Sequence, residues 1–269
     1  MKLSILSDEI SSDPGSAAEL AAEWGLKHFE LRGWYRRRAP AGMSDEDMVG
    51  LRKTWQGFGL DCPSISPGLF KVRLDDPALE EHRGPFRERC FDLAEAMGAR
   101  VVVCFPPILA EGEGWRDWPA SVVEDLRGAA EAARARGLVL ALENEPSCYG
   151  GCGLALAELV AEVGHPGLRA NWDPGNHTHA TGEDYREPYA ALKPYHVHTH
   201  VKDYAGKGAR AAPPGEGGVD WLGQLRALKK DGYKGLIVLE THFEPRIAGS
   251  QRCIQHMRDL LAQAGEEAE

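Results

Sequence analysis

The sequence is poor in several features that mark particular classes of protein. No stretch reaches the roughly 18 apolar residues that a membrane-spanning helix needs, and Asp8 interrupts the first apolar residues too early for a secretory leader. Basic residues are in the minority, with 31 Lys and Arg against 41 Asp and Glu and a net charge of −10. Because nucleic-acid binding depends on clustered basic side chains, we expect a cytoplasmic protein that binds neither membranes nor nucleic acids.

Cysteine is also scarce, and its spacing matches no familiar motif. The six cysteines include one close pair, Cys148 and Cys152, whose three-residue gap differs from the two-residue gap of zinc and redox motifs. The remaining composition, 43% hydrophobic and 27% charged, is ordinary for a globular protein and excludes wholesale disorder. We therefore expect a folded chain whose thiols are reduced and mostly buried.

Short apolar segments alternate with longer amphipathic ones along the whole chain. Eight short segments predict buried strands, at residues 3–6, 28–31, 62–65, 101–104, 139–142, 168–172, 195–201 and 236–239. Eight helical patterns accompany them, at residues 14–24, 44–58, 77–97, 120–136, 154–163, 184–192, 219–230 and 246–264. This repeat predicts an α/β fold, a single (β/α)₈ TIM barrel that forms one domain over residues 1–269.

Four side chains of the kind that bind metals follow four successive predicted strands. They are Glu143, Asp173, His200 and Glu240, each about one strand–helix unit from the next. The carboxyl ends of barrel strands meet at one mouth, where active sites of this fold lie. Three carboxylates and an imidazole suit one divalent ion such as Mn²⁺, Mg²⁺, Co²⁺ or Zn²⁺. Without a cation, the carboxylates would repel one another.

The segments around these residues carry a family resemblance. Residues 140–146, 171–176, 198–203, 215–221 and 235–242 resemble the xylose-isomerase-like TIM barrel superfamily, which includes sugar phosphate isomerases and epimerases. The resemblance implies that Glu143, Asp173, His200 and Glu240 bind one divalent metal ion. It also implies that Glu143 and Glu240 are catalytic, and exchange protons with opposite faces of a substrate carbon through an enediolate.

Some members of the superfamily are apurinic endonucleases, and this sequence departs from them. Those enzymes carry additional histidine ligands, whereas Asn176 and Ser64 stand at two of the corresponding positions here. The departure and the acidic net charge argue against a role in DNA repair. The ketose epimerases also carry a histidine at the position of Asn176, so the substrate cannot be carried over from them directly.

Several further residues are candidates for contact with a sugar or polyol substrate. Asn176 and His177 follow Asp173, Lys202 follows His200, and Glu30 ends the second predicted strand. The tryptophans Trp34, Trp115 and Trp118 lie in predicted loops, where an aromatic ring could stack on a sugar face. Arg246 begins the last predicted helix, where it could hold an anion. The candidate substrate-binding residues are Asn176, His177, Lys202, Glu30, Trp115 and Arg246.

Two other functions remain open on the same residues. If a leaving group lies next to the carbon that loses its proton, the same site would eliminate it, as a dehydratase or lyase does on a keto-polyol, a keto-acid or a 3-keto-glycoside. Alternatively, the barrel could be a sugar-binding subunit without catalysis. We also expect that the chain can form a homo-oligomer, as members of this superfamily do.

Overall fold

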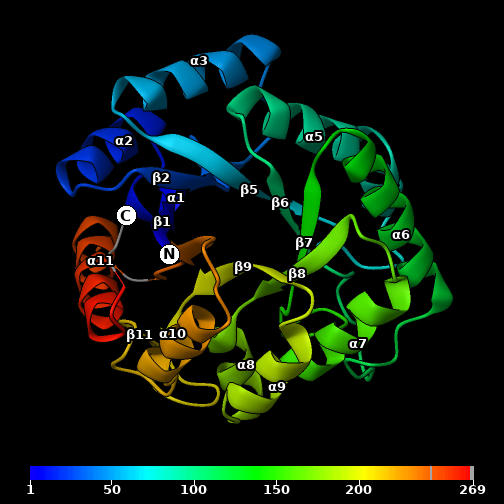
Figure 1. Cartoon of the computed structure of the whole chain (residues 1–269). Coiled ribbons are helices and arrows are strands. Elements are labelled where there is room, and N and C mark those ends of the chain that lie inside the picture. The colour runs from blue at the N-terminus through cyan, green and yellow to red at the C-terminus, as the bar shows by residue number, and fades with distance from the viewer. Residues whose placement is uncertain (243, 267–269) are drawn as a thin grey trace.

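The chain forms a closed barrel of parallel strands that is surrounded by helices (Figure 1). The computed structural model describes residues 1–242 and 244–266. Around the barrel the strands follow the order β1 (Lys2–Leu6), β12 (Leu236–Leu239), β9 (His196–Val201), β8 (Leu168–Trp172), β7 (Val139–Glu143), β6 (Val101–Cys104), β5 (Asp61–Leu69) and β2 (His28–Leu31). The predicted TIM barrel is confirmed, and each predicted strand segment lies in one of these strands or within one residue of it.

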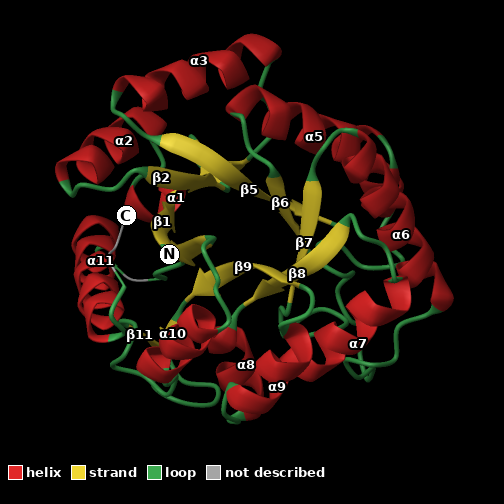
Figure 2. Cartoon of the chain, in the orientation of Figure 1, coloured by secondary structure: helices red, strands yellow, loops and turns green. Residues whose placement is uncertain are grey.

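The helices make the outer ring in Figure 2. They are α2 (Pro14–Glu23), α3 (Asp45–Gly57), α4 (Ala78–Arg83), α5 (Pro85–Met97), α6 (Ala120–Ala135), α7 (Gly153–Val163), α9 (Arg186–Leu192), α10 (Trp221–Lys230) and α11 (Arg246–Gln263). The prediction of one helix over residues 77–97 is wrong, because the structure divides this segment at Gly84. Pro85 explains the break, since proline lacks a backbone N–H and disfavours helical geometry at the preceding residue.

Hydrogen bonds at the helix ends follow signals in the sequence. At the start of α3, the Ser44 hydroxyl accepts a hydrogen bond from the Asp47 backbone N–H at 3.1 Å. The Asp47 carboxylate in turn accepts one from the Ser44 N–H at 2.8 Å, which completes a capping box. At the C-terminal end of α5, Gly98 adopts a left-handed φ of 78° that most residues avoid. These local features position the helices of the outer layer.

Four smaller elements escaped the sequence analysis, and all of them directly follow barrel strands. They are the helices α1 (Ser7–Ile10) and α8 (Pro174–Thr181), and two hairpins formed by β3 (Gly33–Trp34) with β4 (Arg37–Arg38) and by β10 (Asp203–Tyr204) with β11 (Ala211–Ala212). They therefore lie at the carboxyl ends of β1, β8, β2 and β9. This is the end of the barrel that carries the candidate site.

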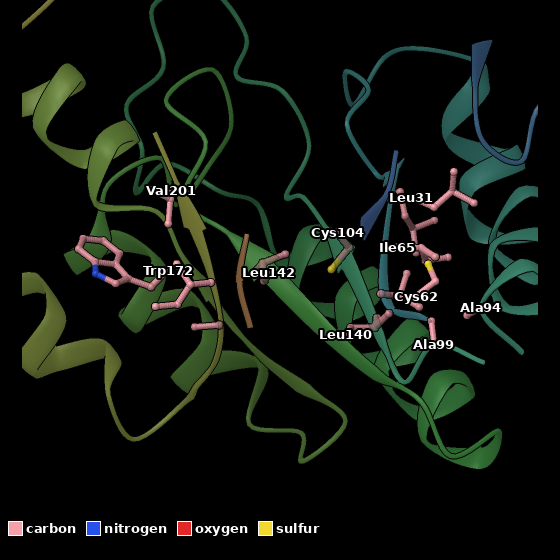
Figure 3. Packing of buried hydrophobic residues seen from close by; sticks show 14 of the residues in the cluster. Leu31, Cys62, Ile65, Ala94, Ala99, Cys104, Leu140, Leu142, Trp172 and Val201 are labelled. Atoms are coloured by element: carbon pink, nitrogen blue, oxygen red, sulfur yellow. The ribbon is translucent and has the colours of Figure 1, made fainter. Parts of the chain in front are cut away.

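Alternation along the strands sorts the apolar side chains into separate layers. On β7, Leu140 and Leu142 belong to the large cluster between barrel and helices, to which Figure 3 assigns Trp172 as well. Ala141 instead joins Val103 in a smaller cluster. Because side chains two residues apart share a face of a strand, Glu143 lies on the same face as Ala141. The strand pattern thus turns the carboxylate away from the helices.

Within residues 1–242 and 244–266, no helix is both long enough and apolar enough to span a bilayer. All six cysteines are buried as free thiols, so Cys148 and Cys152 are not joined by a disulfide.

Candidate metal centre

Four ligand-type side chains converge at the mouth of the barrel. Glu143 is the last residue of β7, Asp173 follows β8 as the residue before α8, His200 lies in β9, and Glu240 follows β12. One ligand atom from each of the four lies within 4.8 Å of all the others. We refer to these four residues as the metal cluster. Parallel strands of similar register bring them together, with His200 paired to Val238 and Glu143 to Asn171.

The Glu30 carboxylate holds the Nε2 side of the His200 ring. Its Nε2 lies 2.8 Å from Glu30 Oε1, and its Nδ1 lies 3.0 Å from Glu143 Oε2. Glu30 also contacts His198 Nε2 at 2.7 Å and accepts a hydrogen bond from the Ser64 hydroxyl at 2.6 Å. A carboxylate on Nε2 favours the tautomer with its proton there, and so directs the Nδ1 lone pair toward the metal cluster.

Amide side chains hold the Glu143 carboxylate and the backbone of Asp173 in place. Asn171 Nδ2 donates to Glu143 Oε2 at 3.0 Å, and Asn176 Nδ2 donates to Glu143 Oε1 at 3.1 Å. Asp173 caps α8, because its Oδ1 accepts a hydrogen bond from the Asn176 N–H at 2.8 Å. Asn144 fixes the same turn through Oδ1, which accepts from the Asp173 N–H, and through Nδ2, which donates to the Asp173 carbonyl.

Positively charged side chains surround Glu240 and its neighbours. Arg32 Nη1 donates to Glu240 Oε1 at 2.6 Å, and His242 Nε2 lies 3.2 Å from the same oxygen. Lys202 Nζ lies 2.6 Å from Glu240 Oε2, 3.0 Å from Asp173 Oδ2 and 3.8 Å from Glu143 Oε1. The Lys202 ammonium therefore lies among three carboxylates, where it neutralises part of their charge.

The acid–base properties of the metal cluster reflect burial opposed by these charges. Burial raises the pKa of Asp173 to about 7, although Lys202 opposes the shift. Burial acts the same way on Glu143, but His200 and Lys202 outweigh it and lower the pKa of that carboxyl. The pKa of Glu240 is held well below its usual range despite burial, because Lys202, His242 and Arg32 stabilise its charge. The two glutamates are thus carboxylates near neutral pH.

The donor set fits a divalent cation. Asp173 Oδ2 and His200 Nδ1 are fully buried and lack a hydrogen bond of good geometry, although charged atoms lie 3.0 Å from each. Three carboxylate oxygens and one imidazole nitrogen match the ligand chemistry of manganese, magnesium, cobalt or zinc. The predicted ligands Glu143, Asp173, His200 and Glu240 could therefore hold such an ion without a change of fold.

The predicted substrate-binding residues differ in where they lie. Asn176 and Lys202 reach the metal cluster through the contacts given above. Glu30 has no exposed surface and lies beneath His200, so a contact of Glu30 with substrate stays a prediction. His177 is also fully buried, and its Nδ1 faces the Gly153 N–H at 3.4 Å, so a substrate contact stays a prediction for this residue too.

Trp115 and Arg246 lie farther from the cluster. The Trp115 indole is half-buried and donates to the Pro146 carbonyl at 3.0 Å, while its ring covers Gly151. Arg246 lies at the start of α11, where it donates to the Asp8 carbonyl at 3.0 Å. A contact of either side chain with substrate stays a prediction.

Sequence reasoning missed several residues that hold the site. Arg32 binds Asp8, Glu9 and Glu240 together, which requires the ends of three separate segments to meet. Asp203 accepts hydrogen bonds from the backbone N–H groups of residues 204, 215, 217 and 219, and so shapes the loop after β9. The only sequence signal for Arg32 and Asp203 was their position just beyond a predicted strand.

The barrel and the cluster at its mouth together define a class, the TIM barrels whose mouth carries carboxylate and histidine side chains that could hold a metal ion. A family model described as xylose isomerase-like TIM barrel matches residues 18–260. The chain belongs to this family. The resemblance drawn from the sequence motifs is thereby confirmed.

Weaker similarity links the chain to another protein sequence and to a solved structure. An uncharacterised protein of Methanocaldococcus jannaschii is 26% identical over 154 residues, a match that covers 54% of this chain and about half (52%) of that protein's length. The zinc-bound structure of the IolI protein has a TM-score of 0.81 at 19% identity and covers 98% of this chain and 99% of its own.

Two further structures, of a probable dehydratase and of an epimerase, share the fold. The probable 3-DHS dehydratase AsbF of Bacillus anthracis has a TM-score of 0.75 at 20% identity, and the match covers 95% of this chain and 99% of that one. The D-allulose 3-epimerase of a Methylomonas species, bound to D-allulose, has a TM-score of 0.75 at 16% identity, with 96% of both chains covered. At these identities the similarity establishes the fold.

Proposed function

We propose that this protein is a divalent-metal-dependent enzyme that isomerises or epimerises a sugar or polyol. One observation carries the proposal: four ligand atoms from four strand ends lie within 4.8 Å of one another, and two of the ligands are glutamates. An ion held there would bind substrate oxygens and stabilise negative charge on the substrate. The zinc in the similar IolI structure agrees with this reading.

Glu143 and Glu240 are suited to move protons to and from substrate carbon. Each lies on a different strand of the barrel, and each has one carboxylate oxygen held by a neutral or positive donor, Asn176 for Glu143 and Arg32 for Glu240. One glutamate takes the proton next to the substrate carbonyl, and the electron pair of the broken C–H bond forms the enediolate. The other glutamate, which first takes up a proton from solvent, returns it to the same or the neighbouring carbon, and the first glutamate then releases its proton to solvent.

Lys202 and the buried histidine–glutamate pair have supporting parts in this proposal. Lys202 supplies positive charge beside Asp173 and Glu240, and its ammonium is placed to donate to a substrate oxygen. Glu30 orients the His200 ring through Nε2. Asn176 orients Glu143, which differs from the direct substrate contact that the sequence suggested.

A lyase is the second candidate, and one finding favours it. The similarity to the probable dehydratase AsbF has the same TM-score, 0.75, as the similarity to the D-allulose epimerase. The same proton abstraction would yield elimination if a hydroxyl or glycosidic oxygen left from the adjacent carbon. Only the product distinguishes the two candidates.

The test measures product and acid–base dependence together. Protein loaded with Mn²⁺, Mg²⁺, Co²⁺ or Zn²⁺ is incubated with a panel of keto- and aldo-sugars, keto-inositols and keto-acids, and the products are identified by NMR in D₂O. Isomerisation or epimerisation incorporates deuterium at the reacting carbon, whereas elimination releases water or an aglycone.

The Glu240→Gln variant tests the assignment of the acid–base pair. Because Gln cannot accept the proton, we expect kcat to fall by about 10²–10⁴-fold. Glu131→Gln on the exposed surface of α6 serves as the control and should retain full activity. Undiminished turnover in Glu240→Gln would refute the proposed role, and ligand binding by wild-type protein without any turnover would favour a sugar-binding subunit.

A further inference from the structure

A cavity of about 760 Å³ opens beside the metal cluster. Three segments line it: residues 8–12 after β1, residues 32–38 around the β3–β4 hairpin, and residues 244–247 at the start of α11 (Figure 1). Its volume falls within the range of about 300–1,000 Å³ typical of small-molecule sites. We call it the arginine cavity, because its wall includes Arg32, Arg36, Arg37, Arg38 and Arg246.

Two of these arginines are already engaged by acidic groups of the protein. Arg32 is held by Asp8, Glu9 and Glu240, and Arg246 lies 3.4 Å from the Glu244 carboxylate. Their charges are therefore largely compensated. Asp8 and Glu244 are also the acidic residues in the wall of the cavity.

The other three arginines lack such partners. Within residues 1–242 and 244–266, no carboxylate lies within 4.0 Å of the guanidinium of Arg36, Arg37 or Arg38. Arg38 makes one hydrogen bond, from Nη1 to the Ser66 carbonyl at 3.2 Å, which leaves most of its five donors available. Three uncompensated positive charges in one wall stand out in a protein of net charge −10.

The β3–β4 hairpin presents these arginines in a demanding backbone conformation. The two residues at its turn, Tyr35 and Arg36, have positive φ angles of 42° and 64°. Tight hairpins of this type usually place Asn or Gly there, because other side chains are strained in the left-handed region. Gly68 completes the arrangement on β5, since a Cβ at that position would lie 3.2 Å from Arg38 Cδ.

The arginine cavity adjoins the metal cluster through Arg32. Arg32 forms part of the cavity wall and donates to Glu240 at 2.6 Å. Arg38 also lies within electrostatic range of the metal cluster. Although the residue keeps contact with solvent, partial burial and the charge of Arg32 lower its pKa, while the charges of Asp8, Glu240 and Glu143 act in the opposite direction. A molecule in the cavity could therefore extend from the arginines to the metal cluster.

We propose that the arginine cavity binds an anionic group, a phosphate or carboxylate, at one end of the substrate while the other end reaches the metal cluster. This inference rests on the proposed function and narrows its substrate to an acidic sugar derivative. The planar guanidinium of Arg38 can donate two parallel hydrogen bonds to either oxyanion, and Arg36 and Arg37 add positive charge at the entrance.

Calorimetric titration of Mn²⁺-loaded protein tests the inference with three probes. D-fructose is neutral, D-fructose 6-phosphate carries a phosphate, and 5-keto-D-gluconate carries a carboxylate. We expect at least one anionic probe to bind about 10-fold or more tightly than D-fructose. The better of the two identifies the anion for which the cavity is shaped.

Variants of the hairpin locate the binding energy. Arg38→Met should lower the affinity for the anionic probe by about 10–100-fold, since a charged hydrogen-bonded contact is lost, and should leave the affinity for D-fructose unchanged. Arg37→Met should have a smaller effect in the same direction. Arg134→Met, on the exposed side of α6, is the matched control and should bind like wild type.

The results separate this inference from the proposed function. Equal affinity of wild type for neutral and anionic probes, or unchanged anion affinity in both Arg38→Met and Arg37→Met, would overturn the arginine cavity as an anion site. Failure of wild-type protein to bind Mn²⁺ in a separate titration would instead count against the metal-dependent function.

Discussion

The metal cluster and the arginine cavity lie side by side at the barrel mouth but are built in opposite ways. Barrel strands and the residues directly after them supply Glu143, Asp173, His200 and Glu240, which are buried or nearly so and matched by opposite charges. A two-stranded hairpin supplies Arg36, Arg37 and Arg38, which are exposed. The charges of the metal cluster are matched within the protein and leave room only for a cation. The arginines of the hairpin instead present their charge to solvent.

The difference shows how burial controls what a charged group can do. A buried charge needs a partner from the protein or a bound ion, because removing it from water costs several kcal/mol. An exposed charge keeps its water and can exchange it for a ligand. Arg32 belongs to both regions, since it lines the cavity and holds Glu240.

Replacement of Arg32 should have the largest effect on stability. Arg32→Met removes the guanidinium shared by Asp8, Glu9 and Glu240 and, among the described residues, leaves Asp8 and Glu9 without an ion-pair partner. We expect a loss of about 3–5 kcal/mol in the free energy of unfolding, measured by urea denaturation of the metal-free protein. A loss below 1 kcal/mol, like that expected for the control Arg134→Met, would show that the two regions are not linked through this residue.

Replacement of Glu30 should weaken metal binding without touching a ligand. Glu30→Gln removes the charge that holds His200 Nε2, so the ring loses its fixed orientation. We expect Mn²⁺ affinity to fall by about 10–100-fold, measured by calorimetry. Glu131→Gln should bind Mn²⁺ normally, and an unaltered affinity in Glu30→Gln would mean that burial alone orients the ring.

His196 provides a pH test on the same strand as His200. Burial, with a contribution from His198, lowers the pKa of His196 to about 4, whereas an unfolded histidine titrates near 6.5. Between these values the unfolded state binds more protons, so stability is present above about pH 6.5 and is lost as the pH falls toward 4.

We expect His196→Gln to remove part of this acid sensitivity. Because the ring is partly exposed, the difference should be on the order of 1–2 kcal/mol between pH 7 and pH 4.5, measured by urea denaturation at each pH. The ring lies among Thr199, Tyr189 and Tyr233, and Asp231 is the nearby acid that favours its charge. Identical pH profiles of wild type and variant would contradict the assignment.

The smallest effect is expected for an exposed ion pair on the outer surface. Arg116 and Glu158 form a paired contact at 2.7 Å, yet each side chain is about half exposed, at 50% and 52%. Arg116→Ala should lower the free energy of unfolding by less than about 1 kcal/mol, because water and salt screen such pairs. A loss as large as that of Arg32→Met would undermine the contrast between buried and exposed charges.

The sequence predicted the barrel well because strand periodicity is a local property. The continuous apolar run at residues 139–142, and the acidic residue Glu143 that follows it, are visible without any tertiary information. Turn and hairpin elements were harder, since neither the β3–β4 hairpin nor α8 carries a strong local signal. The burial of Glu30 and His177 could not be foreseen, because position near a strand end does not reveal which way a side chain points.

The order of residues alone determined that eight strands alternate with helices and that four ligand-type residues end successive strands near the carboxyl edge. Only the folded barrel decided which side chains meet. Glu30 turns beneath His200, Lys202 enters among the carboxylates, and Arg32 joins three distant segments. These contacts depend on closure of the ring, which brings β1 beside β12 and β2, and no local pattern encodes a distance between residues more than 200 positions apart.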